Sequence, residues 1–536
     1  MISNPFPFYI YTPIKPSYIN TTITLTSKEI EIFNTITSIL KANNCTNTIC
    51  RVAGGWVRDK ILGKDSIDID IALSDMKGVD LAKMINAALY PDKDKVGLIH
   101  QNAEKGKHLE TATIRVCDIW IDFVNLRSDD ENKIGTPLED AERRDITINS
   151  LFYNINTNTI EDFTKKGIDD LRNGIIRTPI PAIKTFKDDP LRILRSIRFA
   201  TKYEFDIDND IANSIKENIV EFKKAYSEVI SNERITKELT LILEGKHPAT
   251  GIYLIYKYDL LYSMLKCDLF NNDNKKIDKN QNINEKTILD CVNIFVIGDF
   301  IIHNIMGDND IQKALLNDID TGDLYKKSMY LLLLTSVFRN YLLKGTKENS
   351  SYSKIICKDV LKLPNEETKD ITILTSLIDE FISIVNNKAY TRLSIGKLLR
   401  NIKYVHLYKM IITSMAIEYI SLLKDTTSII NIIDQGVMTS ISNKYREFIK
   451  YCLTENLLHI DDMKPLLDGQ AIISTLQISP GKEIGVLLES LVDRQIEMPT
   501  MSHSAAVEFL NKKREEIKGK YVTESNKKSG KKNKKK

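Results

Sequence analysis

Two aspartates one residue apart are the strongest chemical feature of this sequence. Asp68 and Asp70 lie in the stretch 66–72, in which isoleucines alternate with polar residues. Such alternation predicts a β-strand, on which side chains two residues apart point the same way. Two ionised carboxylates held close together repel each other unless a cation lies between them. A divalent metal, usually magnesium where oxygen ligands and phosphates meet, would supply that charge.

A glycine turn precedes the predicted strand. Gly54 and Gly55 allow backbone N–H groups to approach a phosphate, and Arg58, next to Asp59, adds a charged guanidinium. Each feature alone has a simpler interpretation, because paired aspartates are common at solvated strand ends and glycine pairs are common in turns. Their order along the chain is more specific, and it favours metal-assisted nucleotidyl transfer.

Asp122 is a candidate third carboxylate. The segments 108–115 and 118–124 both alternate polar and apolar residues, as two neighbouring antiparallel strands do. On the second segment, Asp122 faces away from the isoleucine and phenylalanine side chains. Two interpretations stay open: Asp122 stands beside the other carboxylates and activates the attacking hydroxyl, or it pairs with a neighbouring cation on the sheet.

A charged box follows at 142–149. Arg144 and Asp145 are suited to hold phosphate and ribose hydroxyls, and Asn149 is placed to assist them. An isolated Arg–Arg–Asp triplet is more often a surface ion pair, so both interpretations stand at this point.

The stretch 186–200 predicts a helix that begins next to Asp188, Asp189 and Pro190. Arginines recur at every third position along it and therefore lie near one side, where a solvated stripe is the simpler interpretation. The stripe begins at the helix N-terminus, however, where a phosphate or a base edge is favoured. The arginines are Arg192, Arg195 and Arg198.

Asp189 and Arg192 are three residues apart, so on one helix they would lie side by side. The carboxylate only accepts hydrogen bonds, and the guanidinium only donates them. Cytosine and adenine offer the complementary donor and acceptor, whereas guanine and uracil present the reverse pattern and would leave buried charges unpaired. The pair would therefore select CTP and ATP without a template. The simpler alternative is an ordinary ion pair.

Length and composition predict a multidomain, soluble and intracellular protein. A chain of 536 residues is too long to fold around a single hydrophobic core. Its 42% hydrophobic and 27% charged residues are ordinary for a globular protein. A net charge of +3 requires any nucleic-acid surface to be local. The 7 cysteines without Cys-x-x-Cys spacing indicate a reducing compartment rather than a zinc site or a disulfide framework. The apolar runs predict no membrane span, and the N-terminus is a poor transit or secretory peptide.

Periodicity and composition divide the chain into five parts. A proline-containing, extended lead-in covers 1–25, and a head of mixed sheet plus helices covers 26–182. A helical neck follows at 183–265, and helical periodicity dominates 287–515. The lysine-rich tail 516–536 is predicted to be disordered.

In this order the motifs identify a family. The chain resembles class II tRNA nucleotidyltransferases, the CCA-adding enzymes, most clearly over about 50–245. The segments 107–113, 122–127 and 161–166 favour the eukaryotic, yeast-like branch. The motifs that carry the resemblance are Gly54-Gly-Trp-Val-Arg-Asp59, Asp68-Ile-Asp70, Glu142-Arg-Arg-Asp-Ile-Thr-Ile-Asn149 and Asp188-Asp-Pro-Leu-Arg-Ile-Leu-Arg-Ser-Ile-Arg-Phe199.

The resemblance implies an α+β fold, with a polymerase-β-like nucleotidyltransferase head followed by an all-α neck, body and tail that grip the tRNA. It implies template-independent addition of CCA to tRNA that lacks its 3′ end, from CTP and ATP, with Mg²⁺ in a two-metal phosphoryl transfer. No membrane and no obligate protein partner is implied. We expect a cytoplasmic enzyme, with nuclear and mitochondrial pools left open.

The resemblance also assigns roles to individual residues. They are Asp68 and Asp70 for magnesium, Asp188, Asp189 and Arg192 for the base, Arg144 and Asp145 for the ribose, Arg58 and Arg195 for the phosphates, and Glu233 and Arg234 for a motif that steadies the neck.

One departure from the family opens an alternative. Relatives carry a longer flexible loop at 128–134, which helps to switch the pocket from CTP to ATP, and bacterial enzymes that add only two cytidines lack it. A CC-adding tRNA nucleotidyltransferase is therefore the main alternative. A bacterial-type poly(A) polymerase fits the head motifs but not the yeast-like segments or the pair of Asp189 and Arg192. A noncatalytic RNA-binding relative does not fit the intact carboxylates.

Overall fold

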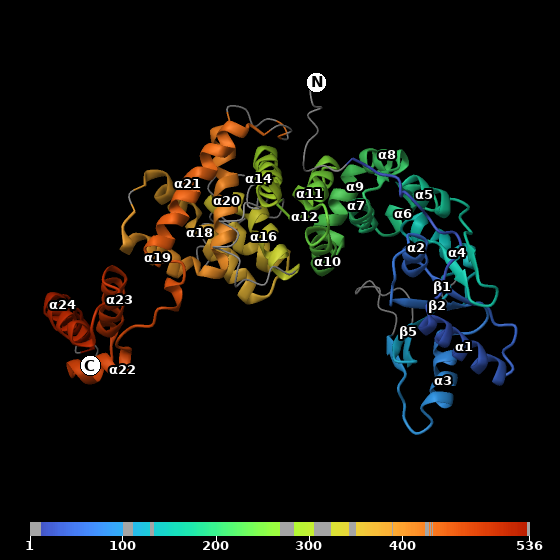
Figure 1. Ribbon diagram of the computed structural model, residues 1–536, viewed down its shortest axis with the longest axis horizontal. Helices are drawn as coiled ribbons and strands as arrows, with labels where there is room; N and C mark the ends of the chain where they lie inside the picture. The colour runs from blue at the N-terminus through green and yellow to red at the C-terminus, as the bar shows by residue number, and fades with distance from the viewer. Residues whose placement is uncertain are drawn as a thin grey trace. The chain divides into compact units, whose positions relative to one another are not determined.

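The computed structural model separates into two compact units (Figure 1). The first comprises 1–299 and 340–368 and contains every strand of the described residues, and the second comprises 300–339 and 369–536 and is helical. The residues that the structure describes are 12–99, 111–128, 133–267, 283–304, 323–341, 350–388, 390–423, 428, 430 and 433–532.

A seven-stranded mixed sheet forms the centre of the head. In chain order its strands are β1 (Cys50–Ala53), β2 (Ile69–Leu73), β3 (Gly97–Ile99), β4 (Thr111–Val116), β5 (Ile119–Asn125), β6 (Phe152–Asn154) and β7 (Thr159–Glu161). They are hydrogen-bonded in the order β3-β4-β5-β2-β1-β6-β7, and β2 runs parallel to β5 but antiparallel to β1. The predicted mixed sheet and the predicted antiparallel pairing of β4 with β5 are confirmed.

The predicted strand at 66–72 is shorter than expected. β2 begins at Ile69, so Asp68 stands just before the strand, and Ile67 is 81% exposed instead of packing behind the carboxylates. The reason is the lack of a pairing partner, because the ladder with β5 starts at Ile69 and Ile121. The alternation of isoleucines with polar residues therefore begins earlier in the sequence than the backbone hydrogen bonds of β2 do.

Helices cover the head sheet and give it a core. They are α1 (Ser27–Ala42), α2 (Gly55–Ile61), α3 (Gly78–Leu89), α4 (Pro137–Glu142) and α5 (Gly167–Asn173), with a 3-10 turn η2 (Thr147–Asn149). α1 begins with a capping box that is formed by Thr26 and Glu29. Glu29 also accepts a hydrogen bond from Trp56 Nε1 at 3.0 Å, which fastens α1 to α2.

The neck consists of short helices around one central helix, α7. In chain order they are α6 (Ala182–Asp188), α7 (Arg192–Tyr203), α8 (Asn209–Glu217), α9 (Ile219–Lys224), the π-helical segment η3 (Ala225–Val229), α10 (Asn232–Leu243), α11 (Pro248–Lys257) and α12 (Leu261–Met264). A parallel pair of two-residue strands, β8 (Ile175–Ile176) and β9 (Asp206–Ile207), joins the end of the head to the neck. The extended lead-in contacts both parts, because Asn20 N donates to Ile61 O and Ile14 N to Glu204 O.

The remaining chain is helical. α14 (Glu285–Asn304), η4 (Val337–Asn340) and α18 (Asn365–Asn387) contribute residues to both units, while α17 (Tyr352–Ile355) and η5 (Ile356–Val360) belong to the first. The other helices of the second unit are α16 (Asp323–Ser336), α19 (Arg392–Ile402), α20 (Tyr404–Leu422), α21 (Gln435–Thr454), η6 (Ile460–Asp462), α22 (Gly469–Leu476), α23 (Lys482–Glu497) and α24 (His503–Lys532).

Two sequence expectations concern this region. The tail 516–536 is expected to be disordered, and in the structure the backbone of α24 is helical to Lys532. The sequence predicted no membrane-spanning helix, whereas α14 is long and apolar enough by length and composition. Because 78% of its apolar window is buried inside the protein, α14 fits a core helix better than a membrane span.

Parts of several predicted features lie outside the described residues. Among them are 1–11 of the lead-in, 107–110 of the yeast-like segment, 129–132 of the shortened loop and 533–536 of the tail.

Candidate active site

Three carboxylates converge at the start of β2. Asp70 on β2 lies opposite Asp122 on β5 in the parallel register, and Asp68 precedes the same strand. Burial, followed by the neighbouring charges of Asp68 and Asp122, raises the pKa of Asp70 to about 6. The predicted convergence of the three carboxylates is therefore present in the structure, and a cation between them would relieve the repulsion.

The partner of Asp122 is a hydroxyl group. Thr113 on β4 is the register neighbour of Asp122, and its Oγ1 donates to Asp122 Oδ1 at 2.6 Å. This bond orients the carboxylate but adds no positive charge, so the alternative in which a cation neutralises Asp122 is not what the structure shows. Its role as a general base stays a prediction.

The carboxylates fit a magnesium site that the substrate completes. Among the described residues, no group of three or more His, Cys, Asp or Glu side chains is already arranged to hold a metal ion. Magnesium is commonly bound by one or two carboxylates, with substrate phosphates and water supplying its other ligands. Asp68 and Asp70 would be those two carboxylates, and Asp70 is destabilised as an anion until a cation arrives.

Gly54 lies at the turn between β1 and α2, where the backbone conformation and the nearby Arg144 leave no room for a side chain. Its φ is 78°, and a Cβ at this position would lie 2.6 Å from Arg144 Nη1. Arg144 is held against the glycine by Asp140, whose Oδ2 accepts from Arg144 Nε and Nη2 at 3.0 and 2.8 Å. Arg144 Nη1 also donates to the carbonyl oxygen of Asn149 at 3.1 Å. The predicted glycine turn and charged box therefore meet in space.

Arg58 lies inside the protein and joins the head to the neck. Its guanidinium donates to Asn149 Oδ1 and to both carboxylate oxygens of Asp59, at 2.9 and 3.0 Å for the latter. It also lies over the rings of Phe199 and Tyr203 on α7, at 5.3 and 5.0 Å from their centroids. The phosphate role of Arg58 stays a prediction, and its contacts here link Asn149 and Asp59 of the head to α7.

The Asp145 carboxylate is buried against Arg195 of α7. Arg195 Nε and Nη2 lie 2.8 and 2.6 Å from Asp145 Oδ2, while Asn149 Nδ2 donates to Asp145 Oδ1 at 3.1 Å. Burial alone would raise the pKa of Asp145, but the positive charge of Arg195 and these hydrogen bonds hold it well below its usual range. The sequence predicts that Asp145 contacts the ribose and that Arg195 contacts the phosphates. In the structure these two residues form an ion pair with each other, which joins the head to the neck.

A buried glutamate on α10 shares the same arginine. Glu238 Oε1 lies 3.4 Å from Arg195 Nη1, and its Oε2 accepts from Arg198 Nε at 2.6 Å. Sequence reasoning missed Glu238, although it lies between buried Ile235 and Leu239 on the apolar face of its helix. An acidic residue on an apolar face signals a buried partner, and that signal was available in the sequence.

The base-reading residues are paired differently from the prediction. Arg192 Nη2 lies 2.7 Å from Asp188, and Asp189 Oδ2 instead accepts from Arg234 Nη2 of α10 at 2.7 Å. The expected side-by-side pair of Asp189 and Arg192 assumed that both lie on one helix. Asp189 is extended and follows α6, Pro190 interrupts the chain, and α7 starts only at Arg192 without a side-chain cap.

This arrangement still presents acceptors next to a donor. Asp188 is exposed while Arg192 is mostly buried, and Arg192 Nη1 is fixed by the carbonyl of Thr185 at 3.3 Å. Ser231 caps α10 at the Arg234 amide, and Glu233 on the same turn is exposed.

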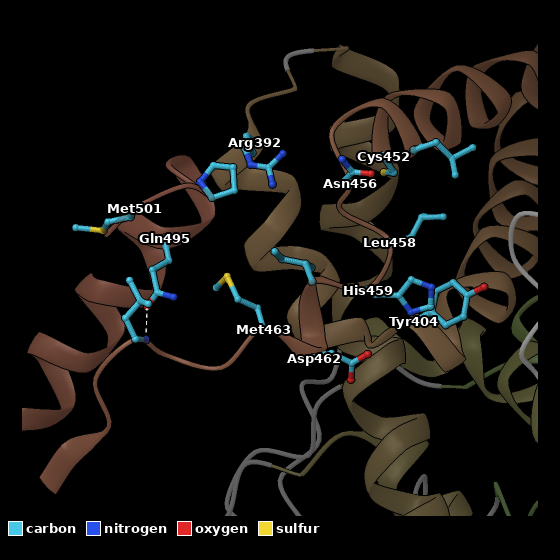
Figure 2. Close-up of a pocket in the computed structure, with 14 residues that line it drawn as sticks. Arg392, Tyr404, Cys452, Asn456, Leu458, His459, Asp462, Met463, Gln495 and Met501 are labelled. Atoms are coloured by element: carbon cyan, nitrogen blue, oxygen red, sulfur yellow. Dashed lines mark hydrogen bonds between the residues drawn. The ribbon is translucent and has the colours of Figure 1, made fainter. Parts of the chain in front are cut away.

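The second unit contains a cavity of about 760 Å³ (Figure 2). Arg392, one of its lining residues, donates from Nε to Ile496 O at 2.6 Å and from Nη1 to the Glu455 carbonyl. At another wall, the ring centroids of Tyr404 and His459 lie 3.9 Å apart. Arg392 thus closes two helix C-termini, and its visible role is to hold the wall together.

Two family models match parts of the first unit. Residues 50–177 match the poly A polymerase head domain, and residues 204–267 match a domain described as the probable RNA and SrmB-binding site of polymerase A. The first match contains the carboxylates and the charged box, and the second begins after α7.

Whole-chain comparison finds relatives with one named activity. The chain is 32% identical over 516 residues to a mitochondrial CCA tRNA nucleotidyltransferase of Candida glabrata, covering 91% of this chain and 96% of the relative. It is 30% identical to the mitochondrial CCA tRNA nucleotidyltransferase of Saccharomyces cerevisiae, covering 84% and 85%. The Thermotoga maritima CCA-adding enzyme complexed with tRNA shares the fold, with a TM-score of 0.57 and 19% identity over 91% of this chain and 96% of that one.

Replacing Asp145 tests the ion pair between head and neck. We expect Asp145→Asn to lower the free energy of unfolding by about 3 kcal/mol, because it leaves Arg195 with half of its buried neutralising charge. The folded pKa of Asp145 is lowered, so its stabilisation is present above the ordinary carboxyl pKa of about 3.9 and is lost as the pH falls below it. Urea unfolding between neutral and acidic pH measures both effects.

The matched control is Asp169→Asn, which breaks an exposed ion pair with Arg172. That variant should change stability by less than about 0.5 kcal/mol. Equal effects of the two substitutions would contradict the assignment of Asp145 as a buried junction.

Replacing Gly54 tests the packing of Arg144 over the turn. Gly54→Ala adds a methyl group that strains the backbone and displaces the Arg144 guanidinium, so we expect nucleotide incorporation to fall about tenfold or more. Gly63→Ala has the same kind of strain, with φ of 70°, but nothing lies within 4 Å of the added Cβ. If both variants lose activity equally, backbone strain rather than Arg144 is responsible.

Proposed function

The chain belongs to the family of CCA tRNA nucleotidyltransferases, and on that premise we propose that it completes tRNA 3′ ends with cytidine and adenosine from CTP and ATP. The three converging carboxylates carry this proposal, because they provide the anionic site that a nucleoside triphosphate with magnesium requires. The substrate is tRNA that lacks its 3′ end. The relatives' shared name and the fold shared with a tRNA complex support it.

The reaction forms one bond and breaks one bond at the α-phosphate. The terminal ribose hydroxyl of the tRNA attacks phosphorus, a new P–O bond forms, and pyrophosphate leaves. In this proposal Asp122 takes the hydroxyl proton, and the bond from Thr113 to its Oδ1 orients the carboxylate for that role. When bound, two magnesium ions would lower the charge on the attacking and leaving oxygens.

The neck supplies nucleotide choice in this proposal. Asp188 and Asp189 accept hydrogen bonds and Arg192 donates them, which complements the edges of cytosine and adenine. Because these groups belong to the protein, no template strand is needed. Arg195 and Asp145 keep this turn at a fixed place relative to the head.

The enzyme's location is proposed from its relatives. Both fungal relatives are named as mitochondrial proteins, so we propose a mitochondrial pool beside the cytoplasmic and nuclear pools. Fractionation of cells that express the tagged chain, with no signal in purified mitochondria, would remove that pool.

A CC-adding enzyme is the second candidate. Its loop prediction falls partly outside the described residues, but the base of the loop is closed: Gly135 N donates to Leu126 O at 2.9 Å, and a Cβ on Gly135 would lie 1.8 Å from Arg127 O. The relatives named for whole CCA addition favour the first candidate.

The carboxylates are tested by removing them. Asp68→Ala and Asp70→Ala should each lower incorporation of CMP at least about 10³-fold, because the cation and the triphosphate lose their site. Asp75→Asn, an exposed aspartate just after the same strand, is the control and should keep full activity. Full activity of either alanine variant in gel assays of tRNA 3′ ends would refute the assignment.

The two candidate functions differ in a single reaction. With tRNA that already ends in CC and with ATP alone, a CCA-adding enzyme lengthens the RNA by one nucleotide, whereas a CC-adding enzyme does not. We expect addition of the terminal adenosine at a rate within about tenfold of cytidine addition. Absence of a lengthened product, with CTP incorporation intact on shorter tRNA, would establish the second candidate.

A further inference from the structure

The turn that carries the base-reading candidates is held from behind by two side chains of the neck. Arg234 of α10 donates to Asp189, and the hydroxyl of Tyr226 donates to the carbonyl oxygen of Pro190 at 3.0 Å. These contacts fix two consecutive residues of the extended turn between α6 and α7. Neither side chain belongs to the turn itself.

Tyr226 is fully buried, and its hydroxyl group makes the hydrogen bond to the turn. The residue lies on the π-helical segment η3 and has no exposed surface. A single π-helical turn often marks a functional position in a helix. Burial holds the pKa of Tyr226 well above its usual value, so the hydroxyl keeps its proton and remains a donor.

The bond to Pro190 is additional to those that form the turn. The same carbonyl already accepts from the amide of Ile193 at 3.1 Å, and Asp189 Oδ1 accepts from the amide of Leu191 at 3.2 Å. The turn therefore has its own hydrogen bonds without Tyr226. The hydroxyl instead sets where the turn points, which matters because Arg192 follows Pro190 by two residues and Asp189 precedes it.

We propose that Tyr226 is a positioning residue for nucleotide choice. A site rejects the wrong base only if its acceptors and donors stay in place when that base enters, because a mobile carboxylate can turn to suit either pattern. Tyr226 restrains Pro190 and Arg234 restrains Asp189, so the Asp189 carboxylate is less able to turn toward the wrong base. The inference rests on the proposed base-reading role of Asp189 and Arg192.

The test is the ratio of kcat/KM for CTP to that for UTP, measured with full-length enzyme and tRNA that lacks CCA. Tyr226→Phe keeps the ring and removes the hydroxyl, and we expect it to lower this ratio about tenfold, the order expected when a fixed hydrogen bond is lost from a selective site. A merely structural role would lower both rates alike and leave the ratio unchanged.

Tyr153→Phe is the matched control. Tyr153 is also buried, and its hydroxyl donates to Asn158 Oδ1 at 3.0 Å, but it lies in the head on β6. It should lose a similar amount of thermal stability with no change in the ratio. An equal fall in the ratio for both variants would overturn the proposal.

Arg192→Ala separates the proposal from the function on which it rests. If Arg192→Ala lowers the ratio and Tyr226→Phe does not, base reading stands and the role of Tyr226 is refuted. If neither variant changes the ratio, the base-reading assignment itself fails. Should Tyr226→Phe not fold, Arg234→Gln removes the second restraint on the same turn, and an unchanged ratio there overturns the proposal.

Discussion

The arrangement of the first unit depends on one arginine that is shared by two buried acids. Arg195 on α7 lies between Asp145 of the head and Glu238 of α10, with its Nε and Nη2 on one carboxylate and its Nη1 on the other. Taking these charges out of water is costly, and the cost is offset only when the pairs stay close. The position of α7 relative to the catalytic strands is fixed by that requirement.

Other contacts of α7 follow from the same placement. Phe199 and Tyr203 lie against Arg58 near the glycine turn, and Tyr203 also donates to Asp59 at 3.0 Å. The helix therefore touches the phosphate-binding candidates along its length and carries Arg192 at its first turn. The proposed chemistry in the head and the proposed base choice in the neck would therefore be linked by the packing of α7 against the head.

The sequence was sufficient where a local pattern decides the structure. Alternation located β2, β4 and β5, and the order of motifs identified the family that whole-chain comparison confirms. It was insufficient where partners come from distant segments. Asp189 pairs with Arg234, which is 45 residues away, instead of with Arg192, because Pro190 separates two helices that looked continuous. Glu238 was missed although its place on an apolar helix face signals a buried partner, whereas the burial of Tyr226 against Pro190 depends on how distant segments pack.

The claim that Arg195 joins the head to the neck is tested most directly by a double-mutant cycle. The measurement is kcat/KM for CTP in Asp145→Asn, Glu238→Gln and the double variant. Because both acids act through Arg195, we expect the two effects to be non-additive by about 1 kcal/mol or more. Effects that add within about 0.5 kcal/mol would contradict the claim, because independent sites behave in that way.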